Sequence, residues 1–340
     1  MSDLARSILL ATVAVLLSAC STVGYYAHVV RGESALLSAR RPVADILADP
    51  AADATLKTRL QLAQAARAFA SERLGLPRNR SYATYVDLHR PYATWNVFAA
   101  PEFSLAPYER CYPVAGCVPY RGYYNLRQAE AYAKGLRAIG FETSISGSSA
   151  FSTLGFFADP ILNTMLPWTD DRMVGMIFHE LAHQRLYVKG DSRFNESFAT
   201  FVQTEGLRQW RASRGLPPAD DTEQQRADDF DQVVLDARGR LQVLYASGLP
   251  ADAMRARKQA EIARLRTELV RVRETRWGGN RAYNGWIEGE INNAKLLPFG
   301  IYHGWDKAFA ALFRNAGGNW DAFYAAAGAI ARDDAASRVR

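Results

Sequence analysis

The stretch "DRMVGMIFHELAHQRLYVKGDSRFNESFATFV", residues 171–202, decides the architecture of this chain. Its first half carries apolar residues at the spacing of a buried helix face, namely Met173, Met176, Ile177, Leu181 and Leu186. The second half repeats that spacing with Phe194, Phe198 and Phe201. A Gly-Asp pair at 190–191 separates the halves and favours a turn. The pattern therefore predicts two antiparallel helices joined by a short connection.

Two histidines lie four residues apart on the first predicted helix. One helical turn takes about 3.6 residues, so His179 and His183 leave the same face and can share a metal ion. Glu196 falls within the apolar stripe of the second helix, where a carboxylate without a partner would be costly to bury. We therefore expect these three residues to bind one Zn²⁺ per chain and to leave a fourth position open. Glu180, directly after His179, is placed to act there as a general base.

Two simpler interpretations of the same residues stay open. An H-E-x-x-H string also occurs by chance in buried helices, and its histidines are then only core residues. Alternatively, zinc stabilises a scaffold or binding lipoprotein of the cell envelope that catalyses nothing. Structural zinc sites, however, are usually closed by four protein ligands, often cysteines. The three ligands expected here favour a catalytic site.

The two-helix arrangement resembles the gluzincin metallopeptidases, whose third ligand is a glutamate on the following helix. More of the chain is similar to a bacterial family of zinc aminopeptidases found as envelope lipoproteins. The similar stretches are "YATWNVFAAPEF", "CYPVAGCVPYRGYY", "FSTLGFFADPIL", "FHELAHQ", "FNESFA" and "NNAKL". The resemblance implies a zincin-like domain that hydrolyses peptides, with aminopeptidase activity. The connection between the two helices is shorter than in the gluzincins, so the overall fold is expected to differ from theirs.

The resemblance also implies a hydrogen-bond donor for the oxyanion that forms during hydrolysis. In gluzincins this donor is a tyrosine or histidine downstream of the third ligand. Tyr302 is the first candidate here, and His303 and Tyr283 are the alternatives.

Four residues are expected to contact the substrate: Ser152, Thr153, Arg121 and Asn293. The first two lie in "SAFSTLG", residues 149–155, a candidate edge strand along which a peptide can add as a further strand. Arg121 binds a carboxylate or forms an ordinary ion pair. Asn293, with Asn292, binds the peptide backbone or satisfies the interior. Three acidic residues could hold a substrate ammonium, and the sequence does not rank them: Glu102, Glu142 and Glu288.

The amino terminus predicts the compartment. Residues 1–19 are expected to be a signal peptide, because their apolar run has about the length of a signal-peptide h-region and is too short to span a membrane comfortably. It ends in Leu17-Ser18-Ala19-Cys20, which resembles the bacterial lipobox, and this resemblance implies cleavage before Cys20 and its lipidation. The absence of aspartate after Cys20 favours an outer-membrane lipoprotein that faces the periplasm. An ordinary signal peptide and an uncleaved anchor helix are the alternatives.

Composition excludes other classes. The 340 residues, 49% hydrophobic and 22% charged, describe a folded protein. The net charge of +6 comes from scattered arginines, without the compact basic and aromatic patch of a nucleic-acid-binding protein. We expect a peptide substrate and a membrane contact through the lipid as partners, with the oligomeric state left open. Cys111 and Cys117 flank a Pro- and Gly-containing turn, and an oxidising compartment predicts a disulfide between them.

The expected organisation is α+β and mostly helical. After a membrane-proximal segment, residues 20–52, the peptidase domain spans residues 53–340. It begins with a helix and a small β-sheet, and reads as helical almost throughout from Asp159 onward. Within it, residues 222–277 show two runs of apolar residues alternating by three and four, which predicts an inserted antiparallel helical hairpin. A helical carboxyl terminus follows.

Overall fold

A computed structural model describes residues 23–112, 116–150, 153, 156–220, 222–300 and 306–338. The predictions for the signal peptide, Cys20, Ser152, Tyr302 and His303 therefore lie outside the described residues. Within the described ranges, a membrane-spanning helix is absent, since none reaches the length and apolar content that crossing a bilayer requires. The chain is mostly helical with small sheets, as the α+β prediction states.

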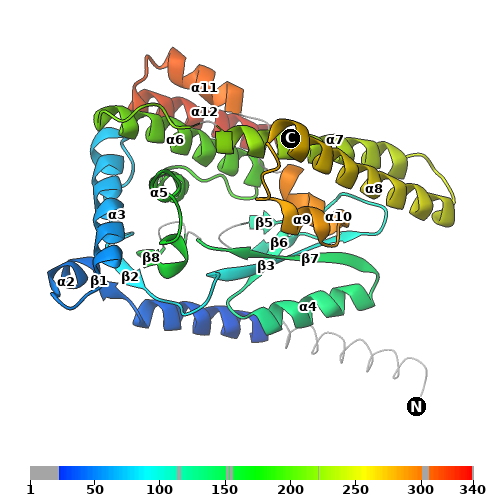
Figure 1. Ribbon diagram of the computed structural model, residues 1–340, viewed down its shortest axis with the longest axis horizontal. Coiled ribbons are helices and arrows are strands. Elements are labelled where there is room, and N and C mark those ends of the chain that lie inside the picture. Colours follow the sequence, from blue (N-terminus) through cyan, green and yellow to red (C-terminus); the bar gives the residue numbers. More distant parts are fainter. Residues whose placement is uncertain are drawn as a thin grey trace.

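A helical layer forms the upper and left part of the molecule in Figure 1. It consists of α3 (Ala54–Arg73), α5 (Asp170–Arg185), α6 (Ser192–Ser213), α11 (Asp306–Asn315) and α12 (Trp320–Arg338). The phenylalanine stripe of α6 is the centre of its core: the Phe198 ring stacks on Phe323 at 5.9 Å, and Phe194 meets Phe309 edge-on at 5.3 Å. Because α5 packs against both α3 and α6, the helix with the two histidines is held from two sides.

A three-stranded antiparallel sheet lies below the helical layer (Figure 1). Its order is β6 (Tyr120–Tyr123), β3 (Thr94–Pro101) and β7 (Phe141–Ser148). Side chains alternate between the faces of a strand. Val97 points toward α4 (Leu126–Ala138) and packs there with Ala129 and Ala133. Asn96 and Phe98 point the other way, toward α5 and α6, and line the cavity described below.

Two smaller sheets flank this one. β1 (Arg41–Pro42), β2 (Thr84–Val86) and β8 (Ile161–Leu162) form the first, and α2 (Val43–Ala48) packs beside it. β4 (Arg110–Tyr112) and β5 (Gly116–Val118) form a hairpin in which Cys111 and Cys117 are paired directly and joined by a disulfide.

The segment before β1 packs on the folded domain. Residues 23–38 are helical. The Tyr25 hydroxyl donates to the carbonyl oxygen of Gly122 in β6 at 3.2 Å, and His28 accepts from the backbone N–H of Tyr124 at 3.0 Å. The helical part of the predicted membrane-proximal segment, residues 20–52, thus packs against β6 and the residue that follows it.

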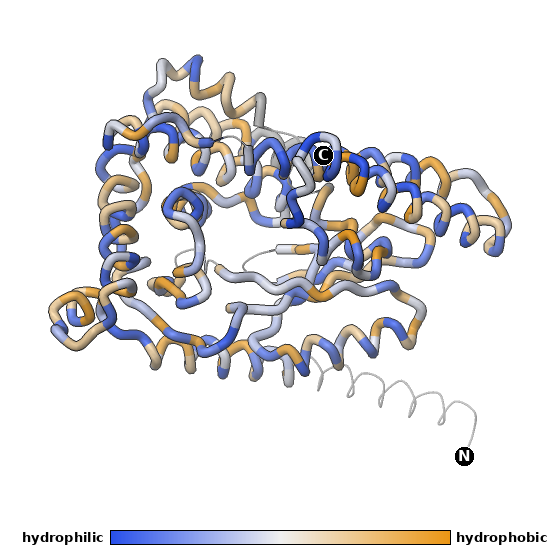
Figure 2. The backbone as a smooth tube through the Cα atoms, viewed as in Figure 1, coloured by the Kyte–Doolittle hydropathy of each residue, from blue (hydrophilic) through white to orange (hydrophobic). Residues whose placement is uncertain are grey.

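The predicted helical hairpin consists of α7 (Thr222–Tyr245) and α8 (Ala251–Arg276), and it projects to the right of Figure 1. Hydrophobic and hydrophilic segments alternate along both helices (Figure 2). The hydrophobic positions form a separate core with residues of the following segment, which contains α9 (Asn284–Glu288), α10 (Asn293–Leu296) and the 3₁₀ turn η2 (Leu297–Gly300). The members on the two long helices are Phe230, Val234, Ala237, Leu241, Ile262, Leu265, Leu269 and Val272.

One expectation for the middle of the chain is wrong. The edge strand ends at Ser148, so the described residues 149, 150 and 153 of the predicted strand 149–155 are not in a strand. Thr153 instead bonds through its backbone N–H and its hydroxyl to the Asp159 carboxylate, a local arrangement that competes with strand pairing. Beyond Asp159 the described residues are helical almost throughout, as predicted; the short strand β8 and the 3₁₀ turn η1 (Asn163–Met165) precede α5.

Candidate metal centre

The connection between α5 and α6 fixes the two helices that carry the candidate ligands. Asp191 caps α6 by accepting from the backbone N–H of Phe194, at 3.0 Å. The Asn195 side chain closes the turn in both directions: its amide oxygen accepts from the Val188 N–H at 2.7 Å, and its amide nitrogen donates to the Val188 carbonyl at 2.8 Å. The residue before Glu196 is therefore fixed to the connection that leaves α5.

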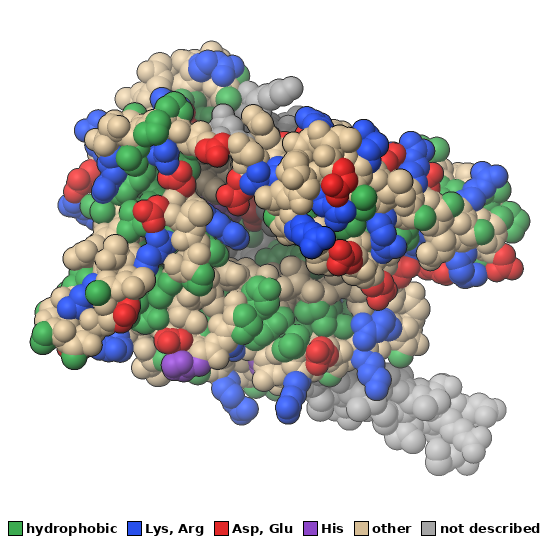
Figure 3. Space-filling model, in the orientation of Figure 1, with side chains coloured by type: hydrophobic (Ala, Val, Ile, Leu, Met, Phe, Trp, Pro, Cys, Tyr) green, Lys and Arg blue, Asp and Glu red, His purple; other side chains and the backbone are tan. Residues whose placement is uncertain are grey.

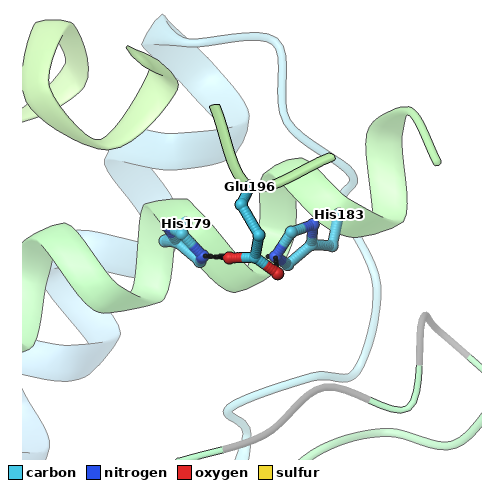
Figure 4. A group of neighbouring side chains, drawn as sticks. All are labelled: His179, His183 and Glu196. Carbon is cyan, nitrogen blue, oxygen red and sulfur yellow. Dashed lines mark hydrogen bonds and ion pairs between the residues drawn. The ribbon is translucent and has the colours of Figure 1, made fainter. Parts of the chain in front are cut away.

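His179, His183 and Glu196 converge on one point (Figure 4). The two Nε2 atoms are 3.2 Å apart. The Glu196 carboxylate oxygens lie 3.4 Å from Nε2 of His179 and 3.8 Å from Nε2 of His183. Two nitrogen ligands at about 2.0–2.1 Å from a tetrahedral ion would stand about 3.3 Å apart. The spacing of the three donors therefore fits a single small cation.

The hydrogen bonds of the imidazoles suit the same interpretation. Nδ1 of His179 lies 3.1 Å from the amide oxygen of Gln203, which accepts its proton and leaves the Nε2 lone pair facing the other donors. Burial and the neighbouring His179 lower the pKa of His183 to about 4, so this ring is neutral, as a ligand must be. Two lone pairs that face each other at this distance need a positive charge between them.

The pKa values of the three residues depend on one another. Burial lowers the pKa of His179, but hydrogen bonding to Glu196 outweighs it and raises the pKa overall. Burial likewise raises the pKa of Glu196, and hydrogen bonding to His179 outweighs that effect and lowers it. His179 and Glu196 thus each favour the charged form in the presence of the other, and a divalent cation at this point would supply the same compensation. The donor set fits zinc.

Glu180 lies beside this group without belonging to it. Its side chain is buried and lines the same cavity as the three candidate ligands. Burial raises the pKa of Glu180 to about 7, although His179 opposes the shift. A carboxylate with such a pKa can both take up and release a proton near neutral pH.

The group opens into a cavity of about 740 Å³ between the helical layer and the sheet. Figure 3 shows the molecule hollowed between these layers. One stripe of α5 lines the cavity on one side, with Arg172, Met176, His179 and His183 at successive turns. The opposite wall includes Thr94, Asn96 and Phe98 of β3, and residues 147–150 at the end of β7.

Comparison with known families supports a hydrolytic role. A family model described as "Putative aminopeptidase" matches residues 24–340, nearly the whole chain. The chain belongs to this family. No curated protein matches it, and no solved structure does. Membership supports peptide hydrolysis at a coarse level, and the match includes residues 24–38 of the helix that precedes β1.

The structure does not bring Arg121 to the cavity. This residue lies between Tyr120 and Gly122 on β6, and these two line the cavity. Arg121 therefore points to the opposite face of the sheet. There its guanidinium lies over the rings of Tyr25, at 3.8 Å, and Tyr132, at 4.8 Å.

Asn293 is also away from the cavity lining. Its side chain is 0% exposed and all of its amide capacity is used inside the protein. The amide nitrogen donates to three carbonyl oxygens, those of Pro101, Glu102 and Ser104. The amide oxygen accepts from the Tyr245 hydroxyl at 2.7 Å. This placement corresponds to the alternative in which the amide satisfies the interior.

The remaining candidates have structural surroundings of their own. Tyr283 stacks on Phe230 at 4.2 Å in the hairpin core. Glu102 pairs with Arg255, and Glu142 pairs with Lys258, both on α8. Glu288 is exposed at the end of α9. Among the described residues that line the cavity, the carboxylates are Glu180 and Glu196, so a substrate ammonium would find no third one there.

Two residues at the site were not predicted from the sequence. Gln203 lies seven positions after Glu196, two helical turns along α6, and this spacing was a signal that it shares the face of the third ligand. Tyr120 and Arg121 are neighbours on β6, and successive side chains of a strand point to opposite faces of the sheet. Only one of the two can therefore face α5 and α6. Without knowledge of the sheet, nothing in "PYRGYY" decides which of them faces the metal centre.

Proposed function

We propose that this protein is a zinc-dependent peptidase of the gluzincin type. His179, His183 and Glu196 would hold the ion, and Glu180 would be the general base. The observation that carries the proposal is the geometry of the three donors: the imidazole Nε2 atoms are 3.2 Å apart, and the Glu196 carboxylate lies 3.4 and 3.8 Å from them. Beside this group lies a buried glutamate, Glu180, that is not one of the ligands. Three protein ligands leave room for substrate, as in catalytic zinc sites.

The residues divide the chemistry between them. A bound zinc ion would supply Lewis-acid polarisation of the scissile carbonyl and lower the pKa of a water molecule toward neutrality. Glu180 accepts the proton of the attacking water and then delivers it to the nitrogen of the leaving amine. Gln203 keeps His179 in the tautomer that presents Nε2. Asn195 keeps Glu196 in register with α5 through its two bonds to Val188.

We propose that the substrate peptide lies in the cavity between α5 and the sheet. β7 is an edge strand of the sheet, and its last residues line the cavity. A peptide there can gain main-chain hydrogen bonds by strand addition. Aminopeptidase specificity rests on the family membership, and the cleavage products would distinguish it from internal cleavage.

We also propose that the mature chain is anchored to the outer membrane through a lipid on Cys20 and faces the periplasm. The support is the Leu17-Ser18-Ala19-Cys20 sequence. Cys20→Ala is expected to abolish labelling by a fatty-acid probe and to leave the precursor uncleaved. Normal labelling of that variant would contradict the anchor.

The function is tested on the full chain with a panel of aminoacyl and internally quenched peptides, in the presence and absence of a chelator. Glu180→Gln keeps the size of the side chain but cannot take up a proton. We expect it to retain about one zinc per chain while kcat falls by about a hundredfold or more. The matched control is Glu130→Gln, which changes an exposed carboxylate on α4 that has no ion pair among the described residues.

Either of two outcomes would contradict the proposal. If Glu180→Gln and Glu130→Gln are as active as the parent, α5 is not the catalytic centre. If zinc binds fully but no peptide of the panel is cleaved, the protein is the zinc-stabilised envelope scaffold instead.

A further inference from the structure

The cavity beside the metal centre is lined by tyrosines, and their hydroxyl groups differ in what they bind. Tyr25 donates to the Gly122 carbonyl, Tyr112 donates to the Tyr25 oxygen at 3.4 Å, and Tyr124 donates to the Glu33 carboxylate at 2.5 Å. These three hydroxyls are therefore already used by the fold. A fourth, Tyr187, contacts the His183 ring and has further interactions with its surroundings.

Tyr120 differs from the others. Within the part of the chain that the structure describes, its hydroxyl makes no hydrogen bond, although its ring is partly buried and lines the cavity with the three candidate ligands. The hydroxyl is not sealed in the core but open to the cavity. It is therefore available to donate to an atom of a bound substrate.

The sheet holds Tyr120 in place. It is the first residue of β6 and pairs with Phe98 of β3, whose ring is 5.4 Å away. Both side chains are on the face of the sheet that looks toward α5 and α6. A donor on a paired strand is held more rigidly than one on a loop, which is what a preorganised hydrogen bond requires.

The electrostatic surroundings keep the hydroxyl protonated. Burial raises the pKa of Tyr120 above its usual range, and the nearby Glu196, Tyr187 and Glu180 raise it further. The phenol therefore remains a hydrogen-bond donor at neutral pH. Tyr120 lines the same cavity as Glu196 and Glu180, from the sheet and thus opposite the helix that carries Glu180.

We propose that Tyr120 is a catalytic residue whose hydroxyl donates a hydrogen bond to the oxygen of the scissile carbonyl as negative charge develops on it. No proton is transferred and no covalent bond is formed by Tyr120. The inference rests on the proposed peptidase function and deepens it, since it assigns the donor to a strand upstream of the two histidines. The sequence had placed this role downstream, on Tyr302.

The test is the kinetics of Tyr120→Phe in the full, zinc-loaded chain, with Tyr132→Phe as the matched control. Tyr132 lies on α4, across the sheet from the cavity, and its oxygen accepts a hydrogen bond from Arg110. Loss of one oxyanion donor lowers kcat by about 10²–10³. We expect that loss for Tyr120→Phe with KM and zinc content nearly unchanged, and parent-like kinetics for the control.

A second measurement separates catalysis from structure. A phosphonamidate peptide imitates the tetrahedral transition state, so its inhibition constant should rise in Tyr120→Phe by the same factor as kcat falls, while KM for the matching substrate does not. If the role of Tyr120 were merely structural, Tyr120→Phe would instead change zinc content, KM and thermal stability.

The outcomes distinguish this inference from the proposed function. If Tyr120→Phe keeps kcat within threefold of the parent while Glu180→Gln is inactive, the donor assignment is overturned and the peptidase function stands. A large loss in Tyr302→Phe alongside an active Tyr120→Phe would return the role to Tyr302. If the parent itself shows no zinc-dependent cleavage, both proposals fail together.

Discussion

Replacing Lys258 with methionine tests how the helical hairpin is attached to the catalytic sheet. Lys258 lies on α8 and its side chain is only 2% exposed. Its ammonium group donates to the carbonyl oxygen of Glu102 at 2.7 Å and to the carboxylate of Glu142, the second residue of β7. The Glu142 carboxylate also accepts from the backbone N–H of Asn293, at 2.7 Å. Lys258 thus joins α8 to β7, and the same Glu142 carboxylate joins α10 to β7. The other end of β7 lines the cavity.

The expected cost follows from the burial of the pair. Removing one partner of a buried ion pair costs about 3–5 kcal/mol, because the other charge stays behind without compensation. The Glu142 side chain is 23% exposed and keeps its bond to Asn293, so water partly compensates it. We therefore expect Lys258→Met to lower the free energy of unfolding by about 3 kcal/mol, the lower end of that range.

The assay is urea denaturation followed by circular dichroism. Arg257→Met is the matched control, since it removes the same charge from an exposed position one residue earlier on α8. The double variant Lys258→Met, Glu142→Gln removes both charges and should recover part of the loss. If Lys258→Met unfolds at the same urea concentration as Arg257→Met, the buried pair does not anchor the hairpin and the reasoning fails.

Two further predictions concern the surroundings of the metal centre. Gln203→Leu removes the acceptor for Nδ1 of His179, and we expect zinc affinity to fall about 10- to 100-fold in a competition titration with a chelating dye; unchanged affinity would contradict the role of Gln203. Gly116 has φ of +77°, and a Cβ there would lie 2.6 Å from the backbone nitrogen of Gly190, in the turn between α5 and α6. Gly116→Ala should destabilise the protein by about 2 kcal/mol or more in urea denaturation, whereas Gly239→Ala, in open space within α7, should stabilise it by about 0.5–1 kcal/mol.

The sequence predicted those features that depend on local periodicity. His179 and His183 lie one turn apart in any helix, so their common face follows from the sequence alone. The predicted place of Glu196 within the phenylalanine stripe of α6 is wrong: Phe194 and Phe198 pack against Phe309 and Phe323, whereas Glu196 is two residues from each, on the other face of the helix, and points at the histidines of α5. The two apolar runs of the hairpin predict α7 and α8 for the same reason. Such patterns need only the helical repeat, so they can be read before the tertiary structure is known.

The features that depend on packing between distant segments could not be predicted. Arg121 and Tyr120 are neighbours, and only the pairing of β6 with β3 decides which one faces the metal centre. Asn293 has an amide that could bind a substrate, but this amide donates to three carbonyl groups, one at the last residue of β3 and two in the loop that follows. The contact of Glu142 with Lys258 spans more than a hundred residues of sequence. Each case depends on a partner that no local pattern indicates.

X-ray absorption spectroscopy of the zinc-loaded full chain tests the central claim most directly, because it reads the atoms around the ion. The proposed site predicts one zinc per chain, with two imidazole nitrogens and one carboxylate oxygen at about 2.0–2.2 Å and a further light-atom donor at the open position. A sulfur donor at about 2.3 Å, or a first shell without two imidazoles, would show that the zinc binds elsewhere and would contradict the assignment of His179, His183 and Glu196.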